Sequence, residues 1–563
     1  MGFFRIFSLL FILVLSWPAR AANLELPVWI DEQVYTLELE PHSIAGLKLT
    51  GNAQLFRGQI AGIPDSWARM SQLNARWEGV VSLHGVLHVI DFSAPTDSTR
   101  SDNTRVLQSS VITATPASAY DNLGTCALHD HQSSPFATAS RSMLDPGTPT
   151  AAAASFSELC TSTVDGVCLL AEIDFVFDQA FQSDFPSDYQ SRAAQLINIV
   201  EGYYRNDLDI AFKTLTTTFL SSEVFSTTTD SFNLLRDISN KKGNGELTFS
   251  SKNEALMQVI TGRDFDGDTV GIAWVGGLCD NGGYFSTGTT QIVGGSLSLT
   301  ALVAAHEIGH NLGSDHDGDP NNSCTGGFIM ATRLDATASR FSSCSISAIQ
   351  SAIGSASNQN ACFDYPFDVE IADSNSVSNL ITSTASRTFR INASAASQAI
   401  TQASISGTIN SGAGRFTSVT IDDIPCSIAG DGQNYSCTLS APGNNHVLVA
   451  DISVATGSYQ VSHNVNVSQS ELTETDTTNN SISDNFTVLT GDSSDSGGGG
   501  DSTETEDPAS SEDTASGNAD SNSASDSGGG SGGGGGSMSA LLLMSLALLL
   551  YRRQTAGTLT CRL

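Results

Sequence analysis

The sequence predicts a mixed α/β domain that lies between a β-rich N-terminal region and a C-terminal β-sandwich. Residues 169–177 form a continuous apolar-leaning run, as expected for a strand buried on both faces, and residues 189–212 have helical periodicity. Alternating runs such as 34–39 indicate strands before this domain. Short alternating runs separated by Gly and Asn, including 388–391 and 446–450, indicate the sandwich after it.

Length and charge limit the classes of function. The chain has 563 residues, with 25 Lys and Arg against 59 Asp and Glu, so its net charge is -34. Phosphate would be repelled, so nucleic acid is excluded as a partner. Hydrophobic residues make up 40% of the sequence, which is enough to build several cores.

Residues 1–21 are predicted to be a secretory signal peptide. Arg5 supplies the positive charge, and the apolar run 6–15 is too short for a comfortable membrane span. The tripeptide 19–21 has alanine at both ends, as cleavage sites prefer. An uncleaved anchor is the alternative. Export would let the ten cysteines oxidise.

Residues 22–150 are predicted to form a β-rich domain followed by a linker. Strand-like alternation continues at 86–90. Residues 132–158 are rich in Ser, Ala, Thr and Pro, which indicates an exposed segment open to proteolysis. Arg141 is one candidate cleavage site.

The stretch from His306 to His316 reads H-E-x-x-H-x-x-G-x-x-H. His306 and His310 lie four residues apart, so on a helix both imidazoles leave from one face. Gly313 can end the helix and return His316 as a third nitrogen ligand. Three neutral imidazoles leave one zinc position open, which is typical of a catalytic site, and Glu307 beside them can act as general base. Ser298 or Thr300 is expected to cap the helix. Its apolar face is expected to consist of Leu299, Leu302 and Val303.

This motif, followed by Asp317, resembles the metzincin zinc endopeptidases and, among them, the reprolysin/adamalysin or ADAM-like branch. Met330 lies in a segment similar to the family's Met-turn, which forms a hydrophobic floor beneath the zinc. The resemblance implies a catalytic domain over residues 160–365, with a mixed five-stranded sheet and an active-site helix. It also implies a zinc cofactor and protein or peptide substrates. Residues 56–67 and 77–85 are similar to the reprolysin pro-domain.

Residues 258–275 resemble the family segment that carries the edge strand above the active-site cleft. The resemblance predicts that Gly271, Ile272 and Ala273 bind an extended substrate by β-augmentation.

Calcium is a second cofactor that the resemblance suggests. Glu172 and Cys362 match two of the family's calcium-binding positions, whereas Ala255 and Tyr365 depart from the pattern. The acids at 264, 266 and 268 lack the glutamate that an EF-hand requires, and we favour a solvated turn over a calcium loop there.

The cysteines predict one unpaired thiol. Removal of Cys561 with the C-terminal tail leaves nine, an odd number. The resemblance favours Cys279–Cys362 and Cys324–Cys344, and proximity favours Cys426–Cys437 and Cys160–Cys168. Cys126 then remains free. In the family a pro-segment cysteine can occupy the fourth zinc position, so Cys126 is the candidate zinc-blocking residue of a zymogen.

The C-terminal third divides by composition. Residues 366–490 are expected to form the immunoglobulin-like sandwich, and 491–537 a disordered acidic Gly/Ser linker. Residues 538–553 combine a short apolar run with an Arg pair, and 554–563 form a tail. The glycine-rich stretch, the short apolar helix and the basic end together resemble the GlyGly-CTERM sorting signal. This resemblance implies transient contact with the inner membrane, and display or release at the surface of a Gram-negative cell. A simple anchor is the alternative.

Together these features predict a monomeric, exported zinc metalloendopeptidase made as a zymogen. A surface adhesin with a vestigial protease domain is the alternative from another class of protein. A zinc hydrolase that acts on a substrate other than protein is a third possibility.

Overall fold

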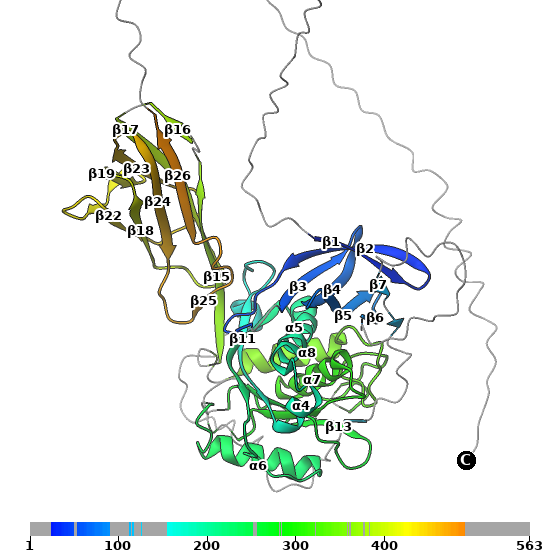
Figure 1. Ribbon diagram of the computed structural model, residues 1–563. Helices are drawn as coiled ribbons and strands as arrows, with labels where there is room; N and C mark the ends of the chain where they lie inside the picture. The colour runs from blue at the N-terminus through cyan, green and yellow to red at the C-terminus, as the bar shows by residue number, and fades with distance from the viewer. Residues whose placement is uncertain are drawn as a thin grey trace, which may run out of the picture. The chain divides into compact units, whose positions relative to one another are not determined.

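The computed structural model describes residues 24–49, 53–90 and 155–489, with short gaps at 251–255, 281, 283, 321, 357–358, 360–361, 375–377 and 382. It also places the backbone of three short strands at 112–113, 115–116 and 125–126 (Figure 1). The predicted signal peptide, candidate cleavage site Arg141, acidic linker, sorting helix and tail lie outside the described residues.

The N-terminal region forms a sheet whose two faces have different partners. On one face Val28, Leu37 and Met70 pack with the sheet's own residues. On the other face Trp67 and Leu87 belong to the core of the following domain. In the order β7-β1-β2-β3-β4-β5-β6-β8, the strands are β1 (Leu24–Ile30), β2 (Gln33–Pro41), β3 (Gln54–Ile60), β4 (Ile63–Leu73), β5 (Arg76–Leu83), β6 (Val86–Ile90), β7 (Ile112–Thr113) and β8 (Thr115–Pro116).

The central domain has the predicted mixed α/β fold. Its own strands run in the order β11-β10-β12-β14-β13, with β13 antiparallel to β14 and the other neighbours parallel. These strands are β10 (Leu169–Phe177), β11 (Ile210–Phe219), β12 (Leu256–Thr261), β13 (Thr269–Ala273) and β14 (Thr287–Gln291). The helices are α3 (Phe156–Leu159), α4 (Gln179–Asp184), α5 (Tyr189–Leu208), α6 (Ser231–Gly243), α7 (Leu297–Asn311) and α8 (Ser343–Ser355).

Two predicted boundaries need correction. The helical periodicity over 189–212 predicted a helix that leads into a strand near 210. The helix ends at Leu208, because Asp209 takes a left-handed conformation (φ 56°), and β11 begins at Ile210 as expected. Residues 156–158, expected to belong to the linker, lie in α3. Glu158 accepts hydrogen bonds from the backbone and side chain of Ser155, which caps this short helix.

Helix α5 joins the N-terminal sheet to the central domain. It contacts both β4 and α7. The buried His42 imidazole lies 2.5 Å from Glu201 on α5. Asn198, one turn earlier, donates to the backbone oxygens of Phe56 (3.3 Å) and Met70 (3.1 Å). Polar contacts as well as apolar packing therefore hold the N-terminal sheet on α5.

The C-terminal region is a two-sheet β-sandwich joined to the central sheet by one strand. Strand β15 (Phe363–Asp373) pairs with β10 at Phe363 and with β17 from Phe367 onward. One sandwich sheet has the order β20-β19-β23-β17-β15, and the other β16-β26-β24-β18-β22-β21. The strands are β16 (Asn379–Leu380), β17 (Thr384–Ala395), β18 (Gln402–Ser411), β19 (Arg415–Ile421), β20 (Ile424–Pro425), β21 (Ser427–Ile428), β22 (Asn434–Ser440), β23 (His446–Ser453), β24 (Gly457–Asn466), β25 (Leu472–Glu474) and β26 (Ser481–Val488).

Among the residues that the structure describes, no helix has the length and apolar character needed to cross a membrane.

Candidate active site

Helix α7 carries the site, and all of its residues are buried. Its N-cap is Ser296, whose hydroxyl accepts a hydrogen bond from the Leu299 backbone N–H at 3.5 Å. The predicted caps Ser298 and Thr300 instead lie inside the helix, because it begins at Leu297. The Thr300 hydroxyl bonds back to the Ser296 carbonyl at 2.7 Å. Leu302 and Val303 belong to the main hydrophobic core, as expected of the helix's apolar face.

The structure brings His306, His310 and His316 together. Nε2 of His316 lies 3.1 Å from Nε2 of His306 and 3.2 Å from Nε2 of His310. Helix α7 ends immediately after Asn311, and Gly313, at φ 101°, turns the chain so that His316 returns to the two helical histidines.

The backbone sets the orientation of two rings. Nδ1 of His306 lies 2.6 Å from the Ile329 carbonyl oxygen, and Nδ1 of His310 lies 2.7 Å from that of Ser314. A carbonyl oxygen can only accept, so each Nδ1 carries the proton and each Nε2 lone pair is free to bind a metal. Asp319 lies 3.7 Å from Nδ1 of His316.

These residues fit zinc. Tetrahedral zinc with nitrogen ligands at ~2.05 Å places those nitrogens ~3.3 Å apart, close to the separations found here. Burial, reinforced by the two neighbouring imidazoles, lowers the pKa of His306 well below its ordinary value. Burial also lowers the pKa of His316 to about 4. Both rings are therefore neutral at pH 7, the state in which imidazole binds metal.

Glu307 lies against the sheet edge. Its side chain is fully buried, and a Cβ at Gly271 on β13 would overlap its Oε1 and Cγ atoms. Only glycine therefore lets β13 pass this close to the carboxylate. Gly271, Ile272 and Ala273, the predicted substrate edge, pair with β14 on one side. On the other side, the backbone of β9 (Thr125–Cys126) pairs in parallel, with Cys126 opposite Gly271.

Met330, the predicted Met-turn residue, packs against Gly309 of α7, next to His310. It is fully buried, and a Cβ at Gly309 on α7 would lie 2.5 Å from its Sδ atom. The Met330 carbonyl accepts a hydrogen bond from the Asp317 N–H at 2.7 Å. The Asp317 carboxylate in turn accepts from the hydroxyl of Ser342 at 2.6 Å. Asp317 thus joins the third histidine's loop to the turn below it and to the start of α8.

Asn311 is a positioning residue that the sequence reasoning missed. Its buried amide donates to the carbonyl oxygens of Trp274 (2.8 Å) and Thr287 (3.0 Å). The N–H of Gly276 donates to the His310 carbonyl at 2.8 Å. The end of the metal-binding helix is therefore tied to the end of the edge strand. The only sequence signal was an amide within the histidine motif, at a position where the motif itself specifies no residue type.

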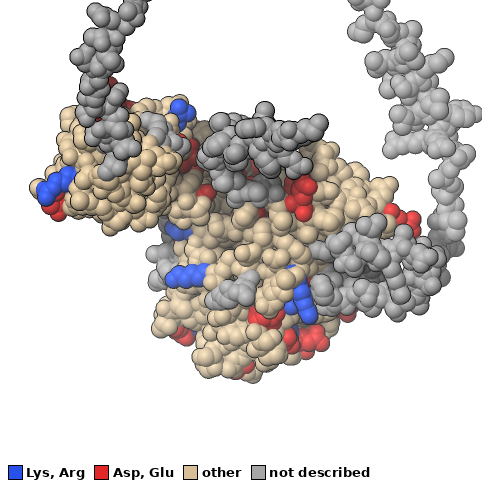
Figure 2. All heavy atoms as spheres, turned by 45° about the horizontal axis from the view of Figure 1, so that its top comes forward, with Lys and Arg blue, Asp and Glu red and all other residues tan. Residues whose placement is uncertain are grey.

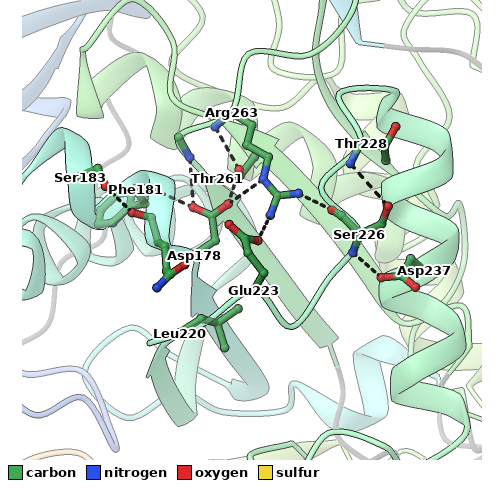
Figure 3. Close-up of polar contacts among 12 residues, drawn as sticks. Asp178, Phe181, Ser183, Leu220, Glu223, Ser226, Thr228, Asp237, Thr261 and Arg263 are labelled. Atoms are coloured by element: carbon green, nitrogen blue, oxygen red, sulfur yellow. Dashed lines mark hydrogen bonds and ion pairs between the residues drawn. The ribbon is translucent and has the colours of Figure 1, made fainter.

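A polar cluster around Arg263 fixes the loop that leads into β13 (Figure 3). Its guanidinium bonds to the Ser226 carbonyl and to Glu223, and lies 3.5 Å from Asp178. Asp178 also accepts from the Thr261 hydroxyl at 2.5 Å. The acids at 264, 266 and 268 that follow are exposed, as expected of a solvated turn.

The structure does not support the suggested calcium site. Lys213 on β11 donates to Glu172 at 2.9 Å and to Asp364 at 2.6 Å. The lysine ammonium thus supplies the positive charge beside the carboxylate that was expected to bind calcium. The Thr473 hydroxyl also donates to Asp364, which links this group to β25 of the sandwich.

Four disulfides are present in the described part of the chain. They are Cys160–Cys168, Cys279–Cys362, Cys324–Cys344 and Cys426–Cys437. The second joins the segment after β13 to the start of β15, and the third joins the loop after His316 to α8. Both loops beside the histidines are therefore covalently fixed.

Three imidazoles, an adjacent glutamate and a sheet edge above them define a zinc metallopeptidase domain. Residues 167–342 match metallo-peptidase family M12, in its reprolysin branch. The chain therefore carries a reprolysin-like metzincin domain.

Known proteins similar to this chain are snake metalloproteinases. The zinc metalloproteinase-disintegrin-like BmMP of Bungarus multicinctus is 44% identical over 90 residues, which is 16% of this chain and 14% of that protein. Zinc metalloproteinase-disintegrin-like atragin of Naja atra is 40% identical over 92 residues, 16% of this chain and 14% of that protein. A zinc metalloproteinase/disintegrin of Bitis gabonica is 42% identical over 89 residues, 16% and 27% respectively. The chain thus spans between about a seventh and a quarter of these relatives.

Proposed function

We propose that the chain is an exported zinc endopeptidase that cleaves extended protein substrates and is made as a zymogen. The observation that carries this proposal is the convergence of three imidazoles and Glu307 beneath the edge of β13. His306, His310 and His316 would hold the zinc. When bound, zinc would polarise a carbonyl group and lower the pKa of water to about 7.

The protein's own groups perform the remaining steps. The backbone of Gly271, Ile272 and Ala273 binds the substrate as an added strand, which places one peptide bond beside Glu307. The Glu307 carboxylate accepts the proton of the attacking water and delivers it to the leaving amine nitrogen. Asn311 holds helix and edge strand in register during this transfer.

Glu307→Ala tests the mechanism. The variant should bind zinc as the wild type does, because the carboxylate is not a ligand, and should lose casein hydrolysis by at least about 1000-fold. Zinc content by atomic absorption and peptide release by fluorescence measure the two quantities. Casein cleavage at the wild-type rate would overturn the proposed mechanism.

Cys126 is proposed to keep the zymogen inactive. Two observations support this role. The four disulfides use the other cysteines before the C-terminal tail, and the backbone of Cys126 pairs with β13 opposite Gly271, where a substrate would bind. The N-terminal sheet also contacts the segment after the Met-turn, where Leu87 N–H donates to the Thr337 carbonyl at 2.9 Å.

Cys126→Ser tests this role on the unprocessed chain. A serine hydroxyl binds zinc much more weakly than a cysteine thiolate does, so the full-length variant should hydrolyse casein without prior cleavage. The wild-type precursor should not hydrolyse casein before it is cleaved. Peptide mapping that finds Cys126 in a disulfide, or a variant precursor as inactive as the wild type, would contradict the role.

Export is proposed on the four disulfides, since such bridges form and persist in oxidising compartments. Display on a Gram-negative surface and a monomeric state stay predictions from the sequence.

A further inference from the structure

The N-terminal sheet and the central domain share one hydrophobic core. The rings of Trp67 on β4 and Tyr203 on α5 meet edge to face with their centroids 5.2 Å apart, and both side chains are buried. They belong to a single cluster of buried residues, to which the N-terminal region contributes Ile44, Leu55, Trp67, Val80, Leu87 and Val89. An interface that resembles one core cut in two is typical of parts that stay associated.

Gly202 shows how closely the sheet approaches α5. A Cβ at this position would lie 2.6 Å from Cγ of Arg69 and 3.2 Å from the Trp67 ring, both on β4. Glycine is unfavourable in the middle of a helix, and here it leaves room for the two β4 side chains. A large side chain at position 202 would therefore push the sheet away from α5.

Two contacts between polar or charged side chains also join α5 to the N-terminal region. The His42 imidazole contacts the Glu201 carboxylate, and both side chains are buried. Arg192 on α5 donates to Glu78 on β5. Figure 2 shows other charged side chains scattered over the visible surface of the described chain. Buried pairs are screened by salt much less than exposed ones, so salt should not separate the sheet from α5.

The sheet also holds segment 337–340, which follows the Met-turn. Leu87 on β6 donates its N–H to the Thr337 carbonyl at 2.9 Å. The Ser82 hydroxyl on β5 donates to the Ser339 hydroxyl at 2.9 Å, and both residues are buried. Two strands of the sheet therefore fix the position of this segment.

Segment 337–340 is bonded in turn to the backbone that orients His306. The Arg340 carbonyl accepts a hydrogen bond from the Ile329 N–H at 3.0 Å. The Ile329 carbonyl oxygen lies 2.6 Å from Nδ1 of His306. A continuous series of contacts therefore leads from the N-terminal sheet to the first histidine of the site.

Strand β9 is attached to the central domain in a different way. It pairs with β13 at two positions, Thr125 with Thr269 and Cys126 with Gly271. So short a pairing can open locally while the shared core stays closed. Release of β9 from the substrate edge therefore does not require release of the sheet.

We infer that the N-terminal sheet is a permanent part of the enzyme. After cleavage of the linker it stays bound to α5 and to segment 337–340 as a separate, noncovalent chain, and it keeps His306 oriented. Activation displaces β9 and leaves the sheet in place. The retention of the sheet is independent of the proposed peptide hydrolysis, whereas its effect on His306 rests on the proposed function.

Controlled cleavage of the full-length chain tests the retention. A recognition site for a sequence-specific protease is inserted at Arg141, in a chain that carries Cys126→Ser and Glu307→Ala. These changes keep a thiolate away from the metal and prevent self-digestion. After cleavage, size-exclusion chromatography and native mass spectrometry should find the two fragments together in a one-to-one complex, at low and at high salt. An N-terminal fragment that elutes apart from the folded remainder would overturn the inference.

Gly202→Leu in the same chain should weaken the complex. Because the added side chain enters space that Arg69 and Trp67 occupy, we expect the dissociation constant of the cleaved fragments to rise at least about tenfold. Gln190→Leu is the matched control, since Gln190 is exposed near the start of the same helix. Circular dichroism before cleavage shows whether each variant is folded, and Gly202→Ala replaces Gly202→Leu if the latter is not. Equal retention in the folded position-202 variant and the control would contradict the inference.

Cobalt(II) reports on the orientation of His306. The visible absorption of bound cobalt depends on the geometry of its ligands, so it should be the same before and after cleavage while the sheet is retained. It should fall where Gly202→Leu has released the sheet. An unchanged spectrum after release would refute the effect on His306. Failure of the uncleaved chain to bind cobalt at all would instead overturn the proposed metal site.

Discussion

Two sites in the described central domain, the histidine cluster and the Lys213 cluster, are built for a cation in opposite ways. His306, His310 and His316 present three imidazole nitrogens, so their cation must come from solution. Glu172 and Asp364 present two carboxylates, and the chain itself supplies the cation as Lys213. The difference teaches that activity and stability depend on different cations. A chelator should therefore abolish activity without lowering the stability that Lys213 provides.

Removal of zinc should give the largest effect. Treatment of the processed form with 1,10-phenanthroline should reduce kcat for casein hydrolysis at least about 1000-fold, because the open metal position supplies the activated water. Added zinc should restore the rate. Residual activity above a tenth of the untreated value, in protein shown free of zinc by atomic absorption, would contradict the claim that activity depends on a cation held by the histidines.

Acid should release the zinc over a defined range of pH. The pKa of His316 is lowered by burial to about 4, and that of His306 also lies well below its ordinary value. Both rings stay neutral as pH falls below 6.5, and protons compete with metal only near pH 4. Dialysis at pH 6 should leave zinc bound, and dialysis below pH 4 should remove it. Loss of half the zinc at pH 6 would contradict these pKa values.

Lys213→Met should affect stability rather than zinc binding. The change leaves two part-buried carboxylates side by side without their cation, which we expect to cost about 2 kcal/mol in the free energy of unfolding. Lys241→Met is the matched control, because Lys241 pairs with Asp237 at nearly the same exposure but on a helix surface. Its loss should cost no more than about 0.5 kcal/mol. Urea denaturation measures both values.

Alkaline pH should remove the stabilisation that the Lys213 charge provides, without a mutation. Burial opposes the charge on Lys213, but hydrogen bonds and the charges of Asp364 and Glu172 outweigh it and raise its pKa above 10.5. The folded state therefore holds this proton more tightly than the unfolded state. The stabilisation is complete below pH 10.5 and disappears as pH rises through the folded pKa. Unfolding curves of wild type and Lys213→Met should converge there.

Calcium should have the smallest effect. Because Lys213 already pairs with Glu172, neither EGTA nor added calcium should move the thermal midpoint of the wild type by more than about 1 °C. A calcium-dependent rise of several degrees would show that the lysine does not replace the ion.

The sequence predicted the histidine site well because its geometry is local. Helical spacing and one glycine turn determine where His306, His310 and His316 lie, all within eleven residues. The contact of Glu172 with Lys213 was missed because Lys213 and Asp364 come from β11 and β15, far away in sequence. The helix cap was placed two or four positions too late, because Ser296, Ser298 and Thr300 are all good caps and packing decides between them. Asn311 was missed because its partners lie on strands that sequence alone does not align.

Helix α7 is buried along its whole length, and this sets how the site moves. Its amide protons can exchange with solvent only when the domain core opens, so their exchange free energies should approach that of global unfolding. The metal-binding nitrogens of His306 and His310 are therefore held by the most protected part of the domain. A bound substrate would therefore adapt to this fixed centre.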